Sequence, residues 1–218
     1  MNIFIIRHGE TELNALGLKQ GPEGSLSEHG RKQMALATAQ LKDIKFSKII
    51  CSPYLRTKES AEILSQAISA PLEYSDLFKE RKNPTEIIGT HKESQEQKDI
   101  MDLIVANRHD PSWHYSDEEN FYDLVERARN ALTFLENQEG ENILIVSHAY
   151  FMGTMILHVL LGDFLTPEVF YSTRMKFPVA NSGVSEIRFV EKDNKKEWRL
   201  ITLNNYQHLT AGIPLEEL

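Results

Sequence analysis

Short apolar runs of strand length alternate with helix-period segments along this chain, and this alternation constrains the fold more than any other sequence feature. The runs occupy residues 2–6, 48–51, 72–74, 142–146, 184–190 and 198–203. Between most of them lie segments with apolar residues three to four positions apart, at 27–41, 53–67, 120–135 and 150–161. Such alternation is typical of layered α/β proteins. It predicts a three-layer α/β/α sandwich around a mostly parallel central sheet.

Three local signals refine this prediction. Ser27 is expected to cap the helix that follows it, and Ser52-Pro53 resembles an N-cap followed by a first helical residue. The polar stretch "EKDNKKE" joins the last two runs, so we expect them to form an antiparallel hairpin at one edge of the sheet. Residues 83–119 are polar and contain one helical pattern at 93–107. We therefore expect one domain over residues 1–218, with a helical and loop insertion over one end of the sheet.

The charge balance excludes some classes of partner. The 218 residues are 41% hydrophobic and 26% charged, with a net charge of -8. An acidic chain lacks the basic surface that nucleic acids and anionic membranes require, so we expect neither as a partner. No apolar stretch approaches the ~18 residues of a membrane span, and the N-terminus carries no basic leader, which favours a cytoplasmic protein. Cys51 is the single cysteine, so no intramolecular disulfide can form, and its apolar surroundings indicate a buried structural thiol.

Chemically useful side chains follow four of the predicted strands. In open α/β sheets, ligands bind beyond the carboxyl ends of the strands. The residues found there are Arg7, His8, Gly9 and Glu10 after the first strand, Ser52 and Arg56 after the second, Asp76 and Glu80 after the third, and Ser147 and His148 after the fourth. We therefore expect two histidines and two arginines to meet at one edge of the sheet.

This set of side chains suits a phosphoryl group. Guanidinium groups bind phosphate oxygens in pairs, and a helix N-terminus adds free N–H donors. Positive charge would then be confined to a pocket in an acidic protein. Each residue also has a structural interpretation: Arg7 could pair with a carboxylate, His8 and His148 could be hydrogen-bonded core residues, and Arg56 could lie on a helix surface.

Four sequence blocks, in this order, resemble the histidine phosphatase superfamily, which is also called phosphoglycerate-mutase-like. They are "RHGETELN", "QGPEGSLSEHGRKQ", "CSPYLRTKESA" and "VSHAYFMGTMI". The resemblance extends from residue 3 to about residue 160, and "NSGVSEIRF" is similar to a late strand of the family. The short length of the chain favours the phosphatase branch over the mutases.

The resemblance implies roles for individual residues. His8 is the expected nucleophile, which would become phosphohistidine, while Arg7, Arg56 and His148 would bind the phosphate. Asn14, Gln20 and Gly21 match positions around the pocket. Glu80 is the expected general acid, with Glu86 or Asp76 as alternatives because "ERKNP" departs from the glycine-containing motif of many relatives. Glu10 would either orient the pocket or cap the loop.

These residue types fit hydrolysis of a phosphate monoester. A neutral imidazole can attack phosphorus if its other nitrogen is held by an acceptor, and like charge on Arg7 and Arg56 would keep His8 neutral. Gly9 would let the backbone approach the ring and the phosphate. Arginines can stabilise the transferred group and a carboxylic acid can protonate the leaving oxygen, so we expect no metal and no cofactor.

Two alternatives to a phosphatase stay open at this point. One is a phosphotransferase of the phosphoglycerate mutase type, and the other is a non-catalytic module that binds phosphate. The expected partner is a small phosphorylated substrate or a phosphoprotein, and the sequence does not indicate an oligomeric state. The insertion offers polar and aromatic groups for recognition that could equally form a solvated surface: Lys82, His91, Lys92, Arg108, His109, Trp113, His114 and Tyr115.

Overall fold

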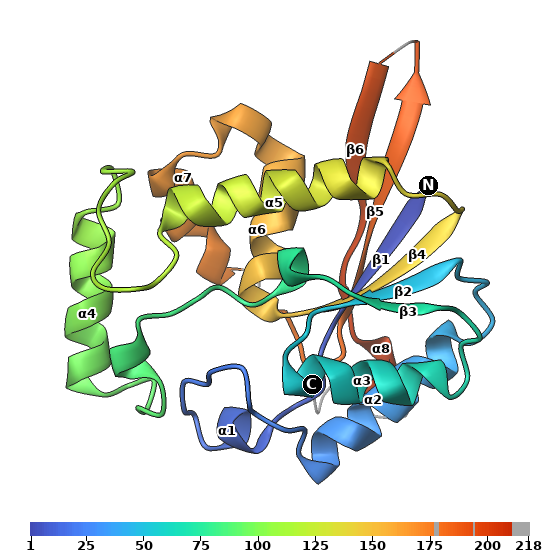
Figure 1. The fold of residues 1–218 in the computed structure, drawn as a ribbon, viewed down its shortest axis with the longest axis horizontal. Coiled ribbons are helices and arrows are strands. Elements are labelled where there is room, and N and C mark those ends of the chain that lie inside the picture. The colour runs from blue at the N-terminus through green and yellow to red at the C-terminus, as the bar shows by residue number, and fades with distance from the viewer. Residues whose placement is uncertain (177–178, 194, 211–218) are drawn as a thin grey trace.

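The computed structural model describes residues 1–176, 179–193 and 195–210, so the predicted domain extends at residues 211–218 beyond the described part of the chain. Figure 1 shows the fold. The strands are β1 (Asn2–Arg7), β2 (Lys48–Cys51), β3 (Leu72–Tyr74), β4 (Asn142–Ser147), β5 (Val184–Lys192) and β6 (Lys195–Asn205). The α-helices are α1 (Glu12–Ala15), α2 (Glu28–Leu41), α3 (Leu55–Ser65), α4 (Gln95–Ala106), α5 (Phe121–Glu136), α6 (Ala149–Leu161), α7 (Pro167–Thr173) and α8 (Gln207–Thr210). Short 3₁₀ turns occur at Asp76–Phe78, Thr85–Ile87, Gly162–Phe164 and Arg174–Lys176.

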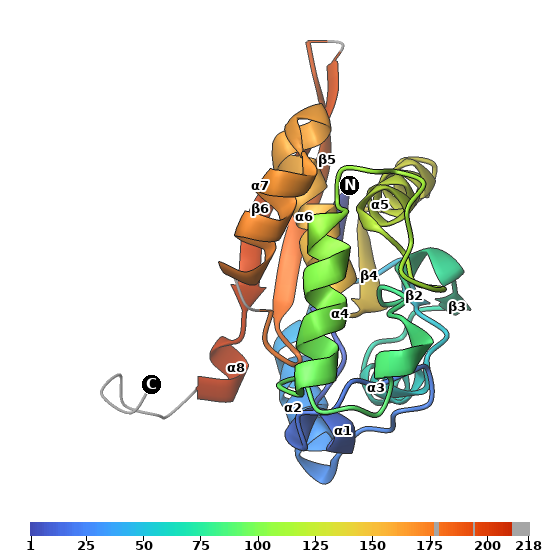
Figure 2. The same cartoon turned by 90° about the vertical axis from the view of Figure 1, so that its left-hand side faces the viewer.

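The six strands form one sheet in the order β3-β2-β4-β1-β5-β6. β1, β2, β3 and β4 run parallel, whereas β5 pairs antiparallel with both β1 and β6. The mostly parallel sheet and the antiparallel edge hairpin are therefore confirmed. The far end of the β5–β6 hairpin projects beyond the other strands (Figures 1 and 2).

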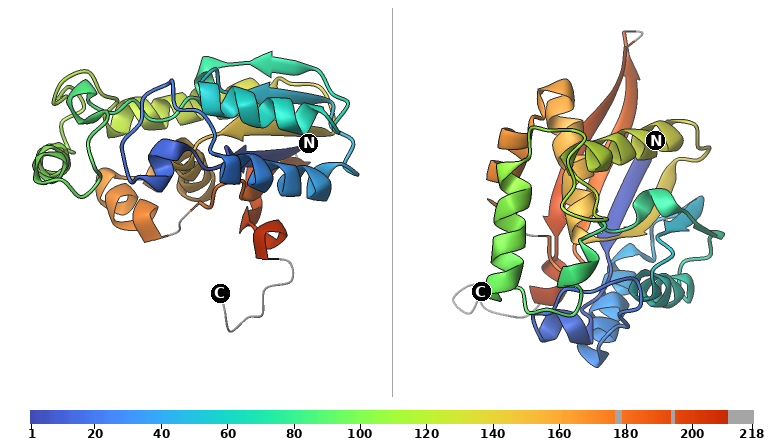
Figure 3. Two further views of the ribbon diagram at one scale, coloured as in Figure 1. Left: turned by 90° about the horizontal axis from the view of Figure 1, so that it is seen from below. Right: turned by 60° about the vertical axis from the view of Figure 1, so that its left-hand side comes forward.

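Alternate residues of the strands face two separate cores, as the period of two requires. Ile3, Ile5, Ile143 and Ile145 pack with α5 and α6 on one face, while Leu144 and its neighbours pack with α2 and α3 on the other. Figure 1 shows these helices on the two sides of the sheet, and Figure 3 gives two further views of the same arrangement. The three-layer α/β/α sandwich is confirmed. Cys51 is fully buried in the second core, and burial raises the pKa of its thiol to about 12.

Two helix starts differ in how well the sequence predicted them. The Ser27 hydroxyl accepts a hydrogen bond from the Gly30 amide at 3.0 Å and caps α2 as expected. The prediction that Ser52-Pro53 begins the next helix was wrong, because α3 begins at Leu55 and its N-cap is Tyr54, which makes no side-chain cap bond. The Ser52 hydroxyl is instead 2.7 Å from Nε2 of His148. Ser52 therefore contacts His148, one of the predicted site residues.

The insertion contains the 3₁₀ turn Thr85–Ile87 and α4, whose bounds lie within the expected 93–107. Ile87, Ile100 and Ile104 form a small core of their own, against which Trp113 and Tyr115 pack. α4 stands outside the two helical layers (Figures 1 and 3), and residues on it and before it line the cavity described next. This position agrees with an insertion over one end of the sheet.

Candidate active site

The two histidines are brought together by the pairing of β1 with β4. Arg7 is opposite Ser147 in the parallel register, and the His8 amide donates to the Ser147 carbonyl at 3.0 Å. His8 and His148 therefore follow neighbouring strands at the same level. Their ring centroids are 5.2 Å apart, and both side chains are almost completely buried.

His8 is held in one tautomer. Its Nδ1 lies 2.6 Å from the carbonyl oxygen of Gly9, which can only accept a hydrogen bond, so Nδ1 carries the hydrogen and Nε2 has a free lone pair. Burial lowers the pKa of His8 well below its ordinary value of 6.5, and the charges of Arg56 and Arg7 lower it further. The expected neutral imidazole is therefore supported, with burial as the larger cause.

His148 is also neutral, and both of its ring nitrogens are engaged. Nε of Arg56 donates to Nδ1 of His148 at 3.2 Å, so Nε2 of the same ring carries the hydrogen and donates to Ser52. Burial, followed by the charge of Arg56, lowers the pKa of His148 well below 6.5. His148 thus contacts His8 and holds Arg56, but it is not among the residues that line the cavity.

A cavity of about 520 Å³ opens beside His8. It brings together most of the residues singled out in the sequence, namely Arg7, His8, Asn14, Gln20, Arg56 and Glu80. A second cavity of about 560 Å³ adjoins it and shares Gln20, Glu80, Arg81 and Asn83 with it. Gly21 lines only this adjoining cavity, and its carbonyl oxygen accepts a hydrogen bond from Arg56 at 2.7 Å.

The two predicted phosphate-binding arginines, buried Arg56 and partly buried Arg7, remain cations near neutral pH. Desolvation by burial lowers the pKa of Arg7 and of Arg56 to about 10, while the charge of Glu80 acts in the opposite direction. Arg7 donates to the carbonyl of Val179, and its Nε is buried without a partner. A buried unpaired donor beside the nucleophile is a site where a ligand oxygen would be stabilised.

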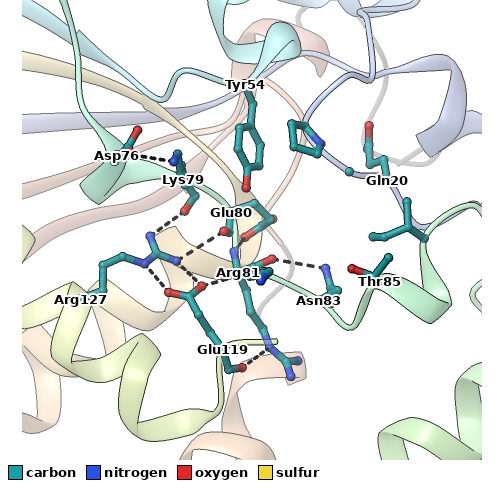
Figure 4. Close-up of a pocket in the computed structure, with 14 residues that line it drawn as sticks. Gln20, Tyr54, Asp76, Lys79, Glu80, Arg81, Asn83, Thr85, Glu119 and Arg127 are labelled. Atoms are coloured by element: carbon teal, nitrogen blue, oxygen red, sulfur yellow. Dashed lines mark hydrogen bonds and ion pairs between the residues drawn. The ribbon is translucent and has the colours of Figure 1, made fainter. Parts of the chain in front are cut away.

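Glu80 is held at the N-terminus of α6. Its carboxylate accepts hydrogen bonds from the amides of Phe151 at 3.1 Å, Tyr150 at 3.3 Å and Arg81 at 2.9 Å. Glu80 lines both cavities, and in Figure 4 the hydroxyl of Tyr54 is directed toward it. Arg127 of α5 fixes the loop before Glu80 by donating to the carbonyls of Leu77 and Lys79, each at 2.9 Å, and is itself paired with Glu119 (Figure 4).

The alternative carboxylates are placed elsewhere. Asp76 pairs with Lys79 at 2.7 Å and lines only the adjoining cavity. Glu86 is exposed and accepts a hydrogen bond from Ser116. Glu10 accepts from the Ser27 hydroxyl at 2.9 Å, so it binds the start of α2 and does not line the phosphate cavity.

The backbone of Gly9 lies against the His8 ring as expected, and its missing side chain permits a further contact that was not expected. A Cβ on Gly9 would clash with the backbone of Gly30 in α2, and a Cβ on Gly30 would clash with the backbone of Glu10. Gly9 therefore permits close packing of α2 against the strand end. The carbonyl oxygen of Gly9 accepts the hydrogen bond from Nδ1 of His8.

Several cavity residues were not identified as site residues from the sequence. Arg174 follows α7, far from any strand end, and Lys19 lies in the loop after α1. The sequence feature related to Arg174 is Gly153 inside α6, because a side chain at position 153 would collide with the Arg174 guanidinium group. Lys92, Gln97 and Met101 come from the insertion, so only part of its polar set reaches the cavity.

Among the residues that the structure describes, no group of three or more His, Cys, Asp or Glu side chains is arranged to hold a metal ion. Within the same part of the chain, no helix is long and apolar enough to cross a membrane.

Comparison with known proteins agrees with the geometry. The chain is 28% identical over 214 residues to an uncharacterized phosphatase, PhoE, of Bacillus subtilis (strain 168), covering 97% of this chain and 98% of that protein. It is 27% identical over 222 residues to a probable phosphoglycerate mutase, GpmB, of Escherichia fergusonii, covering 100% and 99%. Its fold matches that of a mutant phosphoserine phosphatase of Entamoeba histolytica in complex with phosphoserine, with a TM-score of 0.76, 24% identity and coverage of 95% and 98%.

The predicted enzyme class, a phosphoric monoester hydrolase, is confirmed by the family and by the phosphatase of Bacillus subtilis. The sequence model of the histidine phosphatase superfamily (branch 1) matches residues 3–205. This chain therefore belongs to the histidine phosphatase superfamily, branch 1.

Proposed function

We propose that this chain hydrolyses a small phosphate monoester without a metal, through a phosphohistidine intermediate on His8. The observation that carries the proposal is the hydrogen bond between Nδ1 of His8 and the Gly9 carbonyl. It leaves Nε2 with a free lone pair in a cavity that Arg7 and Arg56 make strongly positive. A neutral, oriented nucleophile beside cations is the arrangement that attack on a phosphate dianion needs.

In the first step, the Nε2 lone pair forms a bond to phosphorus while the bond from phosphorus to the ester oxygen breaks. Arg7 and Arg56 stabilise the charge on the three equatorial oxygens during the transfer, as positioned cations do in other phosphoryl transfers. The leaving alcohol oxygen takes a proton from the carboxyl group of Glu80, which lines the same cavity.

In the second step, the Glu80 carboxylate takes a proton from a water molecule as the water oxygen attacks phosphorus. The N–P bond breaks, its electron pair returns to Nε2, and inorganic phosphate is released. Hydrogen bonds donated by the backbone amides of Phe151, Tyr150 and Arg81 keep the carboxyl group oriented for both transfers.

His148 acts mainly as a positioning residue in this proposal. It holds Nε of Arg56 at 3.2 Å, while the Gly21 carbonyl accepts from Nη1 of the same arginine. The Arg56 side chain is thereby fixed from both sides. Asn14 and Gln20 complete the cavity wall next to the phosphate.

The proposal is tested with purified protein, p-nitrophenyl phosphate and a panel of small phosphate monoesters. We expect turnover by the wild type, at least 10³-fold less in His8→Gln, and an acid-labile, base-stable phosphoryl label that His8→Gln cannot acquire. His109→Gln is the matched control, because His109 is exposed and pairs with Glu168 on the surface. Full activity of His8→Gln would overturn the proposal.

Two other outcomes would point to the remaining alternatives. Interconversion of 3- and 2-phosphoglycerate with little release of phosphate would favour a mutase, the activity named for the Escherichia fergusonii relative. Binding of phosphate without labelling or turnover would favour a non-catalytic module.

A further inference from the structure

The cavity beside His8 carries more positive charge than one phosphate group requires. Its described lining includes six cationic side chains, Arg7, Lys19, Arg56, Arg81, Lys92 and Arg174, and one carboxylate, that of Glu80. A phosphate monoester brings at most two negative charges. Clustered like charges destabilise a protein unless a ligand compensates them, so the surplus indicates a ligand with a further anionic group.

Three of these cations form a group on the insertion side of the cavity, which we term the distal cluster: Lys19, Arg81 and Lys92. Nζ of Lys19 lies 3.5 Å from Oδ1 of Asn83, and the charges of Arg81 and Lys92 both act on Lys19. Lys92 in turn is influenced by the charge of Arg7. The distal cluster is thus within electrostatic range of the group that would bind the phosphate.

Backbone hydrogen bonds hold in place the two segments that carry the lysines of the distal cluster. The Lys19 amide donates to the Thr90 carbonyl at 3.0 Å, the Gly89 amide donates to the Lys19 carbonyl at 2.8 Å, and the Lys92 amide donates to the Gly17 carbonyl at 2.9 Å. This pairing ties the loop after α1 to the insertion. Lysines on hydrogen-bonded backbone segments are already positioned to bind a ligand, whereas lysines on a free loop are not.

Unpaired polar atoms gather in the same cavity. Five buried side-chain polar atoms of the described residues lack a partner, and four of them belong to lining residues: Arg7 Nε, Asn14 Oδ1, Arg81 Nη2 and Gln97 Oε1. Buried polar groups are normally hydrogen-bonded, so such a concentration indicates a ligand that supplies the partners. Anionic oxygens would satisfy the two arginine donors, and a hydroxyl or ammonium group of the ligand would satisfy the two amide oxygens. Arg81 and Gln97 are only 4% and 7% exposed, and both lie on the distal side.

We propose that the distal cluster binds a second anionic group of the substrate, a carboxylate or a second phosphate. This inference rests on the proposed function, since the first phosphate is placed at His8, and it narrows the substrate to a small phosphate monoester that carries another anion. The cavity of about 520 Å³ suits a molecule of that size.

The test uses two pairs of esters that differ only in the second anion. Phosphoserine is compared with phosphoethanolamine, which lacks the carboxylate, and fructose 1,6-bisphosphate is compared with fructose 1-phosphate. We expect kcat/KM to favour the doubly anionic member of at least one pair by tenfold or more, and the pair that responds distinguishes carboxylate from phosphate.

Variants assign the preference to named residues. In the double variant Lys19→Met, Lys92→Met we expect the ratio of kcat/KM values to fall to threefold or less. Lys32→Met is the matched control, because Lys32 pairs with Glu28 on the exposed surface of α2, and its ratio should equal that of the wild type. Unfolding temperatures of all variants identify any loss that comes from misfolding.

Two results would overturn the inference: ratios near one for both pairs in the wild type, or an unchanged ratio in the double lysine variant. Failure of the proposed function is recognised separately, as absence of turnover of p-nitrophenyl phosphate and of label on His8. In that case calorimetric binding of both pairs of esters decides the inference, since a tenfold difference in affinity within either pair supports the subsite and equal affinities within both pairs contradict it.

Discussion

The Glu80 carboxylate accepts a hydrogen bond from the Phe151 amide at 3.1 Å, so the predicted general acid is anchored to the first turn of the helix that follows His148. Glu80→Gln should therefore reduce catalysis in a way that depends on the leaving group. We expect kcat/KM for phosphoserine, which reports formation of the phosphohistidine, to fall about 10²–10³-fold, because a serine alkoxide needs a proton. For p-nitrophenyl phosphate the loss of kcat/KM should stay below about tenfold, because nitrophenolate leaves without one.

Asp76→Asn and Glu86→Gln are the controls for this experiment, since those carboxylates are placed away from the His8 cavity. A leaving-group-dependent loss in either control, with none in Glu80→Gln, would move the acid role to that residue.

The sequence predicted the residues whose position follows from a strand end. Arg7 is the last residue of β1 and His8 follows it, while Arg56 lies in the first turn of α3, the helix after β2. Because parallel strands end at the same edge of the sheet, their meeting could be inferred without coordinates.

The distal side of the site could not be predicted in this way. Lys19 reaches the cavity through backbone pairing with residues 89–92, some 70 positions away in the chain. Arg174 reaches it because Gly153 leaves room on α6. Contacts of this kind arise from tertiary packing, and no local period or cap encodes them.

Gly30→Ala should destabilise the protein, although glycine to alanine within a helix normally stabilises by about 1 kcal/mol. A methyl group at Gly30 would collide with the backbone of Glu10, which cannot move without displacing the strand end. We expect a loss of about 2–3 kcal/mol and a decrease in Tm of roughly 4–12 °C, measured by thermal unfolding. Ala39→Gly, on an exposed position of the same helix, is the control and should lose only about 1 kcal/mol. An increase in Tm of Gly30→Ala would contradict the packing argument.

Gly153→Ala should affect substrate binding more than stability. The new methyl group would meet the Arg174 guanidinium group, which is a side chain and can shift, whereas Gly30 faces backbone. Displacement of Arg174 from the cavity wall should raise KM about five- to tenfold, at the level of one weakened charged hydrogen bond. Steady-state kinetics and thermal unfolding separate the two effects, and an unchanged KM with a large loss of Tm would show a structural role only.

Folding stability should decrease as the pH falls below about 6.5. Burial keeps the pKa values of His8 and His148 well below 6.5 in the folded protein, whereas the unfolded chain takes up protons near that value. The unfolded state then binds more protons, so stability is lost on acidification, by at most about 1.4 kcal/mol per pH unit for each histidine.

Urea unfolding at pH 7, 6 and 5 measures this dependence. The double variant His8→Gln, His148→Gln should flatten the pH dependence, while His109→Gln should leave it as in the wild type. An equally steep dependence in the double variant would assign the acid sensitivity to other groups.

The preference for doubly anionic esters should weaken as the pH rises above about 8. Burial, assisted by the charges of Arg81 and Lys92 and opposed by Glu80, lowers the pKa of Lys19 from 10.5 to about 8. Deprotonation above that pH removes one charge from the distal cluster. Arg7 and Arg56, with pKa values of about 10, keep theirs through most of that range. The ratio of kcat/KM for phosphoserine over phosphoethanolamine should therefore decline from about pH 8 upward, since kcat/KM reports ionisations of the free enzyme and free substrate. Both substrates carry an amine, so its ionisation largely cancels in the ratio.

Lys19→Arg supplies a cation of intrinsically higher pKa and should extend the plateau to higher pH. A decline at the same pH in Lys19→Arg would assign the titration to another group.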